Sequence, residues 1–288
     1  MKNIIDHIYV VKEYDPSSQD CCVYLIDSQS SEGLILIDAG IRVEGFKEIE
    51  KFGFHLENLK HCLITHGHLD HFGACSMLKD FNEDIKFYAH ELDAEQIEQK
   101  PTGRYVEQFY GDYNYKPVKL EHKVRDNEVL KFGALEFRCV HIPGHTKGSI
   151  AYYLELDKKK ILFGGDVPGI AININDGNLD DYIVSMEKLL EYDIDILCEG
   201  HEDIIEPSAK VKKFIKSYIK FNKGLNTIVL ENPYDTSTIL ELAENCYELG
   251  FYSTALDFCN YLLEIEPNHY EGRSLLQKIE KHYPIKQE

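Results

Sequence analysis

The sequence predicts an α/β protein, a layered sandwich of sheets and helices that is followed by a small all-α extension. Short β-branched runs alternate with helical stretches through the first two thirds of the chain, which favours a layered sandwich. From about residue 225 onward the apolar pattern is wholly helical. A chain of 288 residues is long enough for one large domain and an appendage. We therefore expect an α/β domain over residues 1–224 and a helical extension over residues 225–288.

Apolar, β-branched runs between turn residues predict the strands. The first two, 22–27 and 33–38, are separated by a Ser-rich turn and are expected to form a hairpin. Further strands are expected at 61–65, 85–89, 134–142, 148–156, 160–163 and 194–198. Apolar residues at helical spacing predict helices at 43–52, 69–81, 91–99, 179–191 and 208–222.

The helical extension contains the spacing of one tetratricopeptide repeat over residues 236–269, and a plain helical hairpin is the alternative. A further helix at 270–282 would cover its open face. One repeat cannot form a solenoid, which needs about three. We expect the extension to serve in homodimerisation or protein docking, or else to pack on the first domain.

Composition limits the partners of the chain. Its 50 acidic and 31 basic residues leave a net charge of −19, which argues against nucleic acid and anionic membranes. Eight scattered cysteines without a Cys-x-x-Cys pair predict free thiols in the cytoplasm, with Cys21 and Cys22 in the core. The N-terminus lacks an apolar signal core and no run approaches the length of a membrane span, so no membrane segment is expected.

A dense cluster of metal-ligand side chains follows the apolar run 62–64. Residues 65–71 read Thr-His-Gly-His-Leu-Asp-His and place His66, His68, Asp70 and His71 within six positions. Imidazole and carboxylate suit zinc and similar divalent metals. On an extended backbone His66 and His68 share a face, and the turn that follows can aim Asp70 and His71 at a second point. The cluster can therefore serve two metals.

Three later residues complete a ligand set. His145, Asp166 and His201 each follow an apolar strand and each lies beside glycine, which lets the backbone approach a ligand closely. Isolated histidines are instead expected to be surface or core residues, as we predict for His7, His55, His90, His122, His269 and His282.

In this order the motifs resemble those of the metallo-β-lactamase-fold hydrolases. The resemblance rests on Leu36-Ile37-Asp38-Ala39-Gly40, the cluster 65–71, His145, Asp166 and His201, and it covers residues 22–205. It implies a four-layered αβ/βα sandwich and a likeness to the glyoxalase II, lactonase and phosphodiesterase branches. True zinc β-lactamases typically lack a bridging aspartate at the position of Asp166.

The resemblance also implies a ligand set for two metals. One metal would be held by His66, His68 and His145, the other by Asp70, His71 and His201, and Asp166 would bridge them. Asp38 would support the site without binding metal.

This site implies a dinuclear hydrolase. We expect two divalent metals, with zinc first and iron or manganese as alternatives. Two such cations lower the pKa of a shared water, and the bridging hydroxide can attack a small ester-like substrate. Asp70 would also be catalytic, by orienting the nucleophile or shuttling its proton.

The substrate stays open among thioester, lactone and phosphodiester. The Gly-Cys-Gly-Arg-like segment of glyoxalase II enzymes does not follow Asp166, and Gly169 stands where quorum-quenching lactonases have tyrosine. Residues 100–119 carry several tyrosines and are expected to form either a substrate lid or a loop packed on the surface.

Two other function classes fit the same pattern. The first is an iron-dependent oxidoreductase of the persulfide dioxygenase or flavodiiron kind, although flavodiiron relatives carry glutamate at the position of His68. The second is a non-catalytic binding module that acts through the helical tail. The complete ligand set argues against this second class.

Overall fold

The computed structural model describes residues 1–14, 20–99, 115–167, 169, 177–202 and 204–282. The chain divides into two compact units, Met1–Val211 and Lys212–Glu288. The boundary expected at residues 224 and 225 lies near the end of helix α7 (Ser208–Asn226), whereas the division lies near its start. Aromatic contacts explain the difference, because Tyr218 and Phe221 of α7 pack on Phe251 and Phe258 of the helical unit.

The first sheet of unit Met1–Val211 has seven strands in the order β1 to β7. Pairing is antiparallel from β1 to β4 and parallel from β4 to β7. The strands are β1 (Lys2–Ile5), β2 (Ile8–Lys12), β3 (Val23–Asp27), β4 (Leu34–Ile37), β5 (Leu59–Leu63), β6 (Lys86–His90) and β7 (His122–Val124).

The second sheet has five strands in the order β12-β11-β10-β9-β8. It is antiparallel except for the parallel pair β11 and β12. The strands are β8 (Val129–Phe132), β9 (Leu135–His141), β10 (Ile150–Leu156), β11 (Lys159–Gly165) and β12 (Ile196–Glu199).

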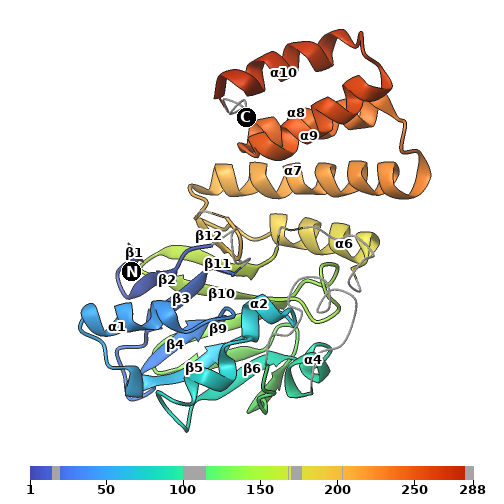
Figure 1. Cartoon of the computed structure of the whole chain (residues 1–288). Coiled ribbons are helices and arrows are strands. Elements are labelled where there is room, and N and C mark those ends of the chain that lie inside the picture. The colour runs from blue at the N-terminus through green and yellow to red at the C-terminus, as the bar shows by residue number, and fades with distance from the viewer. Residues whose placement is uncertain (15–19, 100–114, 168, 170–176, 203, 283–288) are drawn as a thin grey trace. The chain divides into compact units, whose positions relative to one another are not determined.

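Two apolar cores hold the layers of this unit together. One core lies between the two sheets and includes Ile26 and Ile35 of the first sheet and Phe137 and Phe163 of the second. The other lies between the first sheet and the helices that cover it, where Phe46 and Phe72 are fully buried. Helix α6 covers the outer side of the second sheet (Figure 1). The predicted four-layered sandwich is confirmed.

Short helices cover the first sheet, and one of them differs from the prediction. The segment expected as a single helix at 69–81 forms two turns, α2 (Leu69–Phe72) and α3 (Cys75–Leu78), separated at Gly73. The backbone there turns away to pair Ala74 N–H with the Gly40 carbonyl at 2.8 Å. The remaining elements are the 3₁₀ turns η1 (Glu44–Phe46) and η2 (Leu56–Asn58), with α1 (Lys47–Lys51), α4 (Ala94–Glu98) and α6 (Leu179–Leu190).

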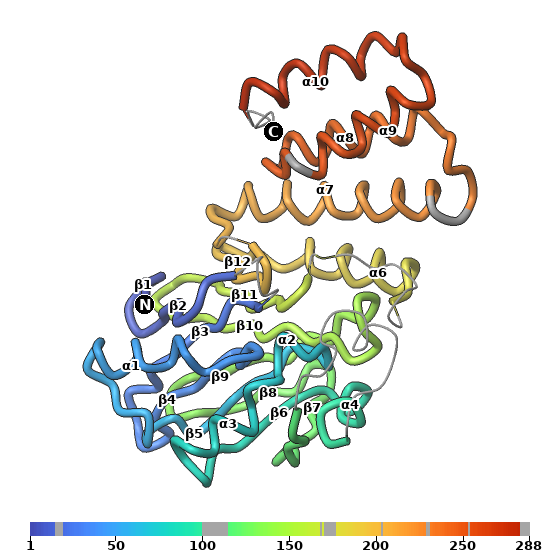
Figure 2. Tube along the Cα trace, viewed as in Figure 1, coloured from blue at the N-terminus to red at the C-terminus, as the bar shows by residue number. Residues whose placement is uncertain are grey.

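The elements described in the second unit are all helices, as Figure 2 shows along the chain trace. After α7 come η3 (Thr227–Glu231), α8 (Thr236–Leu249), α9 (Tyr252–Ile265) and α10 (Tyr270–His282). Asp235 caps α8 by accepting from the Ser237 and Thr238 amides, and Gly250 ends it in the left-handed conformation. Leu242 of α8, Leu262 of α9 and Leu275 of α10 are buried. Much of the apolar surface of the extension is therefore buried within the unit itself.

None of the helices in the described ranges is long and apolar enough to cross a bilayer. All eight cysteines are free and buried, which agrees with the predicted free thiols and with the core positions predicted for Cys21 and Cys22.

Candidate metal centre

Strand register brings the predicted ligands to one edge of the sandwich. In the first sheet Ile37 of β4 pairs in parallel with Leu63 of β5, so Asp38 and Thr65 leave the sheet side by side. In the second sheet Gly165 of β11 pairs with Glu199 of β12, which places Asp166 beside the Gly200–His201 segment. The turn between β9 and β10 carries His145. Residues more than a hundred positions apart in sequence therefore meet.

All seven predicted ligands lie together and form two overlapping groups. The potential ligand atoms within each group lie within 4.8 Å of one another. One group contains His66, His68, His145 and Asp166, and the other contains Asp70, His71, Asp166 and His201.

The three imidazoles of the first group point toward one another. His68 Nδ1 and His145 Nε2 lie 2.9 Å apart, and the rings of His66 and His145 have centroids 4.8 Å apart. The Asp166 Oδ2 atom lies 3.3 Å from His145 Nε2 and 3.9 Å from His66 Nε2. His66 and His68 are buried.

The second group surrounds the other oxygen of Asp166. Asp166 Oδ1 lies 2.9 Å from His71 Nε2 and 3.1 Å from His201 Nε2. His201 Nε2 also lies 3.1 Å from Asp70 Oδ2. One carboxylate therefore faces both imidazole groups, one oxygen toward each.

The donor set fits a pair of divalent cations. His66 Nε2 and Asp166 Oδ1 are buried and make no hydrogen bond within the described part of the chain. A buried polar atom without a partner is costly unless another species satisfies it. Imidazole nitrogen and carboxylate oxygen are ligands for zinc and related metals, so these atoms are placed as metal ligands would be.

Asp38 orients Thr65 and His71 of the cluster by hydrogen bonds. Its Oδ1 accepts from the Thr65 amide at 2.8 Å, and its Oδ2 accepts from the Thr65 hydroxyl at 2.8 Å and from His71 Nδ1 at 2.9 Å. In the neutral ring that a cation would require, donation from Nδ1 leaves the lone pair on His71 Nε2, the nitrogen that faces Asp166. Asp38 adopts a φ of 58°, a left-handed conformation that aspartate tolerates better than most residues.

Glycine is required where the His201 loop passes the cluster. A Cβ atom at Gly200 would lie 2.6 Å from Asp166 Oδ1 and 2.8 Å from His71 Cε1. Gly200 N–H donates to the Gly165 carbonyl at 2.7 Å, and the buried Glu199 carboxylate accepts from His201 N–H at 2.6 Å. These contacts hold His201 close to Asp166.

The pKa shifts divide the imidazoles into two kinds. Burial lowers the pKa of His66 well below its usual value and, together with His145, lowers the pKa of His68 to about 3. Burial also disfavours the charged form of His201, but Asp166 outweighs it and raises the pKa of His201 to about 11.

His71 shifts in the same direction as His201. Burial lowers its pKa, while Cys21, Asp166 and Asp38 raise it, and the net effect lies well above the usual value. The pKa of Asp70 is raised by burial but lowered more strongly by His71 and His201, so this carboxyl stays ionised.

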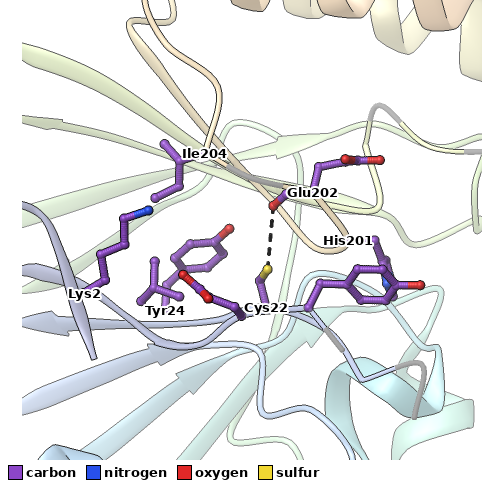
Figure 3. Close-up of a pocket in the computed structure, with 9 residues that line it drawn as sticks. Lys2, Cys22, Tyr24, His201, Glu202 and Ile204 are labelled. Atoms are coloured by element: carbon purple, nitrogen blue, oxygen red, sulfur yellow. Dashed lines mark hydrogen bonds between the residues drawn. The ribbon is translucent and has the colours of Figure 1, made fainter. Parts of the chain in front are cut away.

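A cavity of about 250 Å³ adjoins the centre behind His201. Figure 3 shows it between the first strands of the chain and the segment that follows β12, and residues Lys2, Cys22, Tyr24, His201, Glu202 and Ile204 line its walls. The Cys22 thiol donates to the Glu202 carbonyl, and burial raises its pKa to about 12. This thiol is neutral near pH 7 and takes no part in the ligand groups.

Two further contributors were not predicted from the sequence. The Thr65 hydroxyl donates to Asp38, and the Asp93 carboxylate accepts from the Gly67 amide of the loop that carries His66 and His68. Their partners depend on strand register and on segments distant in sequence, so no local motif marks them. Most of the segment predicted as a lid, residues 100–114, lies outside the described residues.

Comparison with protein families gives two matches. A model described as the metallo-beta-lactamase superfamily matches residues 20–201. A model of the Fis1 C-terminal tetratricopeptide repeat matches residues 242–286, which agrees with the predicted repeat.

Curated relatives include hydrolases. The chain is 33% identical over 152 residues to the hydroxyacylglutathione hydrolase GloC of Haemophilus influenzae, covering 52% of this chain and 66% of the relative. It is 31% identical over 146 residues to an uncharacterized protein of Aquifex aeolicus, covering 51% and 64%. The chain therefore spans just under two thirds of each relative. A shorter match, 36% over 78 residues, is to an acyl-coenzyme A thioesterase of Gallus gallus and covers 26% of this chain and 27% of the relative.

Solved structures share the fold. A subclass B3 metallo-beta-lactamase of Bradyrhizobium japonicum aligns with a TM-score of 0.63 at 23% identity, covering 78% of this chain and 93% of the other. A class B3 di-zinc metallo-beta-lactamase from an Alaskan soil metagenome aligns with a TM-score of 0.62 at 21% identity, covering 77% and 90%.

Proposed function

Because the chain belongs to the metallo-beta-lactamase superfamily, we propose that it is a dinuclear zinc-dependent hydrolase that cleaves a small thioester. One observation carries the proposal. The Asp166 carboxylate directs one oxygen at the His145 group and the other at His71 and His201, the arrangement expected of a residue that bridges two cations.

The residues of this chain would divide the work between them. His66, His68 and His145 would hold one cation, Asp70, His71 and His201 the other, and Asp166 both. Two bound cations would supply a hydroxide at neutral pH and polarise a carbonyl oxygen.

Asp70 carries the further role that we assign to this chain. Its carboxyl is ionised and contacts His201 at 3.1 Å, so it can accept a hydrogen bond from an attacking water and orient that water. Asp38 would keep His71 in the tautomer that presents Nε2 to the cation.

The relatives favour a thioester over the other ester-like substrates. The Gallus gallus relative is named an acyl-coenzyme A thioesterase, and the Haemophilus influenzae relative is named a hydroxyacylglutathione hydrolase. The two names share hydrolysis of an acyl group carried on a thiol compound. We therefore place a thioester first, before a lactone or a phosphodiester.

The test is a substrate panel with matched variants. Purified protein is assayed with acyl-glutathione and acyl-coenzyme A thioesters, a lactone, a β-lactam and bis-p-nitrophenyl phosphate. We expect thioester hydrolysis by the wild type and its loss, together with loss of bound zinc, in His66→Ala and Asp166→Ala. His61→Ala is the control. His61 is a buried histidine of β5, the strand that precedes the cluster, and its ring nitrogens form hydrogen bonds with Tyr88 and Glu32.

Three results would contradict the proposal. Hydrolysis by a metal-free His66→Ala protein would exclude the metal centre as its cause. Cleavage of the lactone or the phosphodiester, with no cleavage of the thioesters, would show that the substrate is not a thioester. Iron without zinc, with consumption of oxygen, would favour the oxidoreductase alternative.

A further inference from the structure

Asp93 is a buried carboxylate that lies outside the ligand set. It follows strand β6, immediately before helix α4, and only 5% of its surface is exposed. A carboxylate at this depth needs hydrogen-bond donors to offset the loss of water. The identity of its donors indicates what the residue does.

The Asp93 carboxylate accepts three hydrogen bonds from two loops. Its Oδ2 accepts from the Gly67 amide at 2.7 Å and from the Thr146 hydroxyl at 2.7 Å, and its Oδ1 accepts from the Gly148 amide at 2.8 Å. The Thr146 hydroxyl also lies 2.8 Å from the Ser149 hydroxyl, which accepts from the Thr146 amide at 3.0 Å. The acceptor is therefore well satisfied.

These two loops carry the three imidazoles of one ligand group. Gly67 stands between His66 and His68, and Thr146 directly follows His145. The loops belong to different sheets, because the first follows β5 and the second joins β9 to β10. One oxygen atom, Asp93 Oδ2, joins them.

The packing around Asp93 agrees with this arrangement. A Cβ atom at Gly148 would lie 2.5 Å from Asp93 Cγ, and one at Gly67 would lie 3.2 Å from Asp93 Cβ. Both loops reach the carboxylate because they have no side chain at the point of approach. The contact is between backbone and carboxylate, so it fixes the course of each loop.

We propose that Asp93 is a positioning residue that fixes the spacing between the His66–His68 loop and the His145 turn, and so preorganises these three imidazoles as one metal-binding group. Its hydrogen bonds go to Gly67, Thr146 and Gly148, so it acts through the two loops. Partners of this kind typically account for ten- to a hundredfold in metal affinity. The inference rests on the proposed function only in so far as the three imidazoles bind a cation.

Asparagine at this position separates shape from hydrogen bonding. Its amide has one acceptor oxygen and one donor nitrogen, whereas all three groups that face Asp93 are donors, two of them backbone amides. If the asparagine oxygen occupies the Oδ2 position, it keeps the hydrogen bonds from Gly67 and Thr146, but the asparagine NH₂ group then faces the Gly148 N–H, which is also a donor. The opposite orientation sets N–H against Gly67. In the first orientation the His145 turn loses its bond from Gly148, and in the second the His66–His68 loop loses its bond from Gly67.

The experiment is a zinc titration of metal-free protein by calorimetry. For Asp93→Asn we expect zinc affinity at one site to fall by about ten- to a hundredfold, and affinity at the other to stay within about twofold. The isotherm should resemble that of His145→Ala and differ from that of His201→Ala. Asp126→Asn is the control. The Asp126 carboxylate lies beside the end of β9, where it accepts from His141 N–H and from the Lys188 ammonium group.

Thr146 provides a second test that leaves Asp93 in place. Thr146→Val removes one hydrogen bond to the carboxylate and should weaken the same site, while Thr146→Ser keeps the hydroxyl and should restore it. If Asp93→Asn does not fold, as judged by circular dichroism, the Thr146 pair decides the question.

The outcomes for Asp93 and for the proposed function are separable. Zinc affinities in Asp93→Asn equal to those of the wild type, or an equal loss at both sites, would overturn the positioning role. Selective loss at one site together with a wild type that hydrolyses nothing in the panel would support the role of Asp93 and refute only the substrate.

Discussion

Replacing Asp38 by asparagine should weaken metal binding by His71, although it removes none of the seven ligand side chains. In the native chain the carboxylate accepts from the Thr65 amide, the Thr65 hydroxyl and His71 Nδ1. Asparagine can adopt the left-handed backbone of position 38, where φ is 58°. The substitution therefore changes the hydrogen bonds and leaves the chain path intact.

The substitution should change which ring nitrogen of His71 carries the proton. If the asparagine oxygen keeps the Thr65 amide, its NH₂ group replaces Oδ2 and faces Thr65 Oγ1 and His71 Nδ1. The hydroxyl can reverse and accept, but Nδ1 must also accept, so the ring proton moves to Nε2. That atom lies 2.9 Å from Asp166 Oδ1 and is the one that would bind the cation.

The expected magnitude follows from these contacts. Loss of one hydrogen bond to a charged acceptor costs about 1.5–3 kcal/mol in the free energy of unfolding. Zinc affinity of the group formed by Asp70, His71 and His201 should fall about ten- to a hundredfold, or about 1.4–2.7 kcal/mol. The group formed by His66, His68 and His145 should be unaffected. Calorimetric zinc titration gives both affinities, and urea unfolding gives the stability.

Asp20→Asn is the matched control. Asp20 is another buried carboxylate, which pairs with Lys12 and accepts from the Ile41 amide. Its replacement should lower stability but leave both zinc affinities unchanged. Zinc affinity of Asp38→Asn equal to that of the wild type would refute the argument from the tautomer.

Three further predictions follow from the centre and from the helical unit. Zinc binding near neutral pH should release at least about two protons, from His71 and His201, because their pKa values are raised in the metal-free protein and a ligand must be neutral. Ionisation of a metal-bound water would add to this number. Calorimetry in buffers of different ionisation enthalpy measures the release, and a release near zero would contradict the prediction. Gly200→Ala should lower zinc affinity and hydrolysis together by at least about tenfold, because its Cβ would lie 2.6 Å from Asp166 Oδ1. Gly53→Ala is the control, because a Cβ at Gly53 meets nothing within 4 Å. An equal loss in both variants would point to general destabilisation. We also propose that the helical unit mediates dimerisation, so light scattering should give twice the chain mass of 33.3 kDa, and a monomer mass would exclude it.

The ligand positions could be predicted because each one is a local pattern. An apolar strand that ends in glycine and a ligand-type side chain is visible in any short window, as at 62–71 and at 163–166. The parallel pairs β4–β5 and β11–β12 then bring these strand ends together. The sandwich followed from the same alternation of strands and helices.

Strands β2 and β8 were missed although their short apolar patterns lie within each segment, whereas other features that were not predicted depend on contacts distant in sequence. Strand β7 has only three residues, two of them exposed, and β1 is an edge strand with no buried side chain, so neither has the apolar alternation that marks a strand. The interruption at Gly73 depends on a backbone pairing with Gly40, and Asp93 acquires its partners from loops 26 and 55 positions away. No pattern within a short window reports such contacts.

Metal content of the purified protein, measured together with thioester hydrolysis, tests the central claim most directly. We expect about two zinc ions per chain, because Asp166 faces two complete ligand groups, and we expect chelation to abolish hydrolysis and added zinc to restore it. Thioester hydrolysis that persists in fully metal-free protein would contradict a zinc-dependent hydrolase, as would a purified chain that binds iron and does not bind zinc.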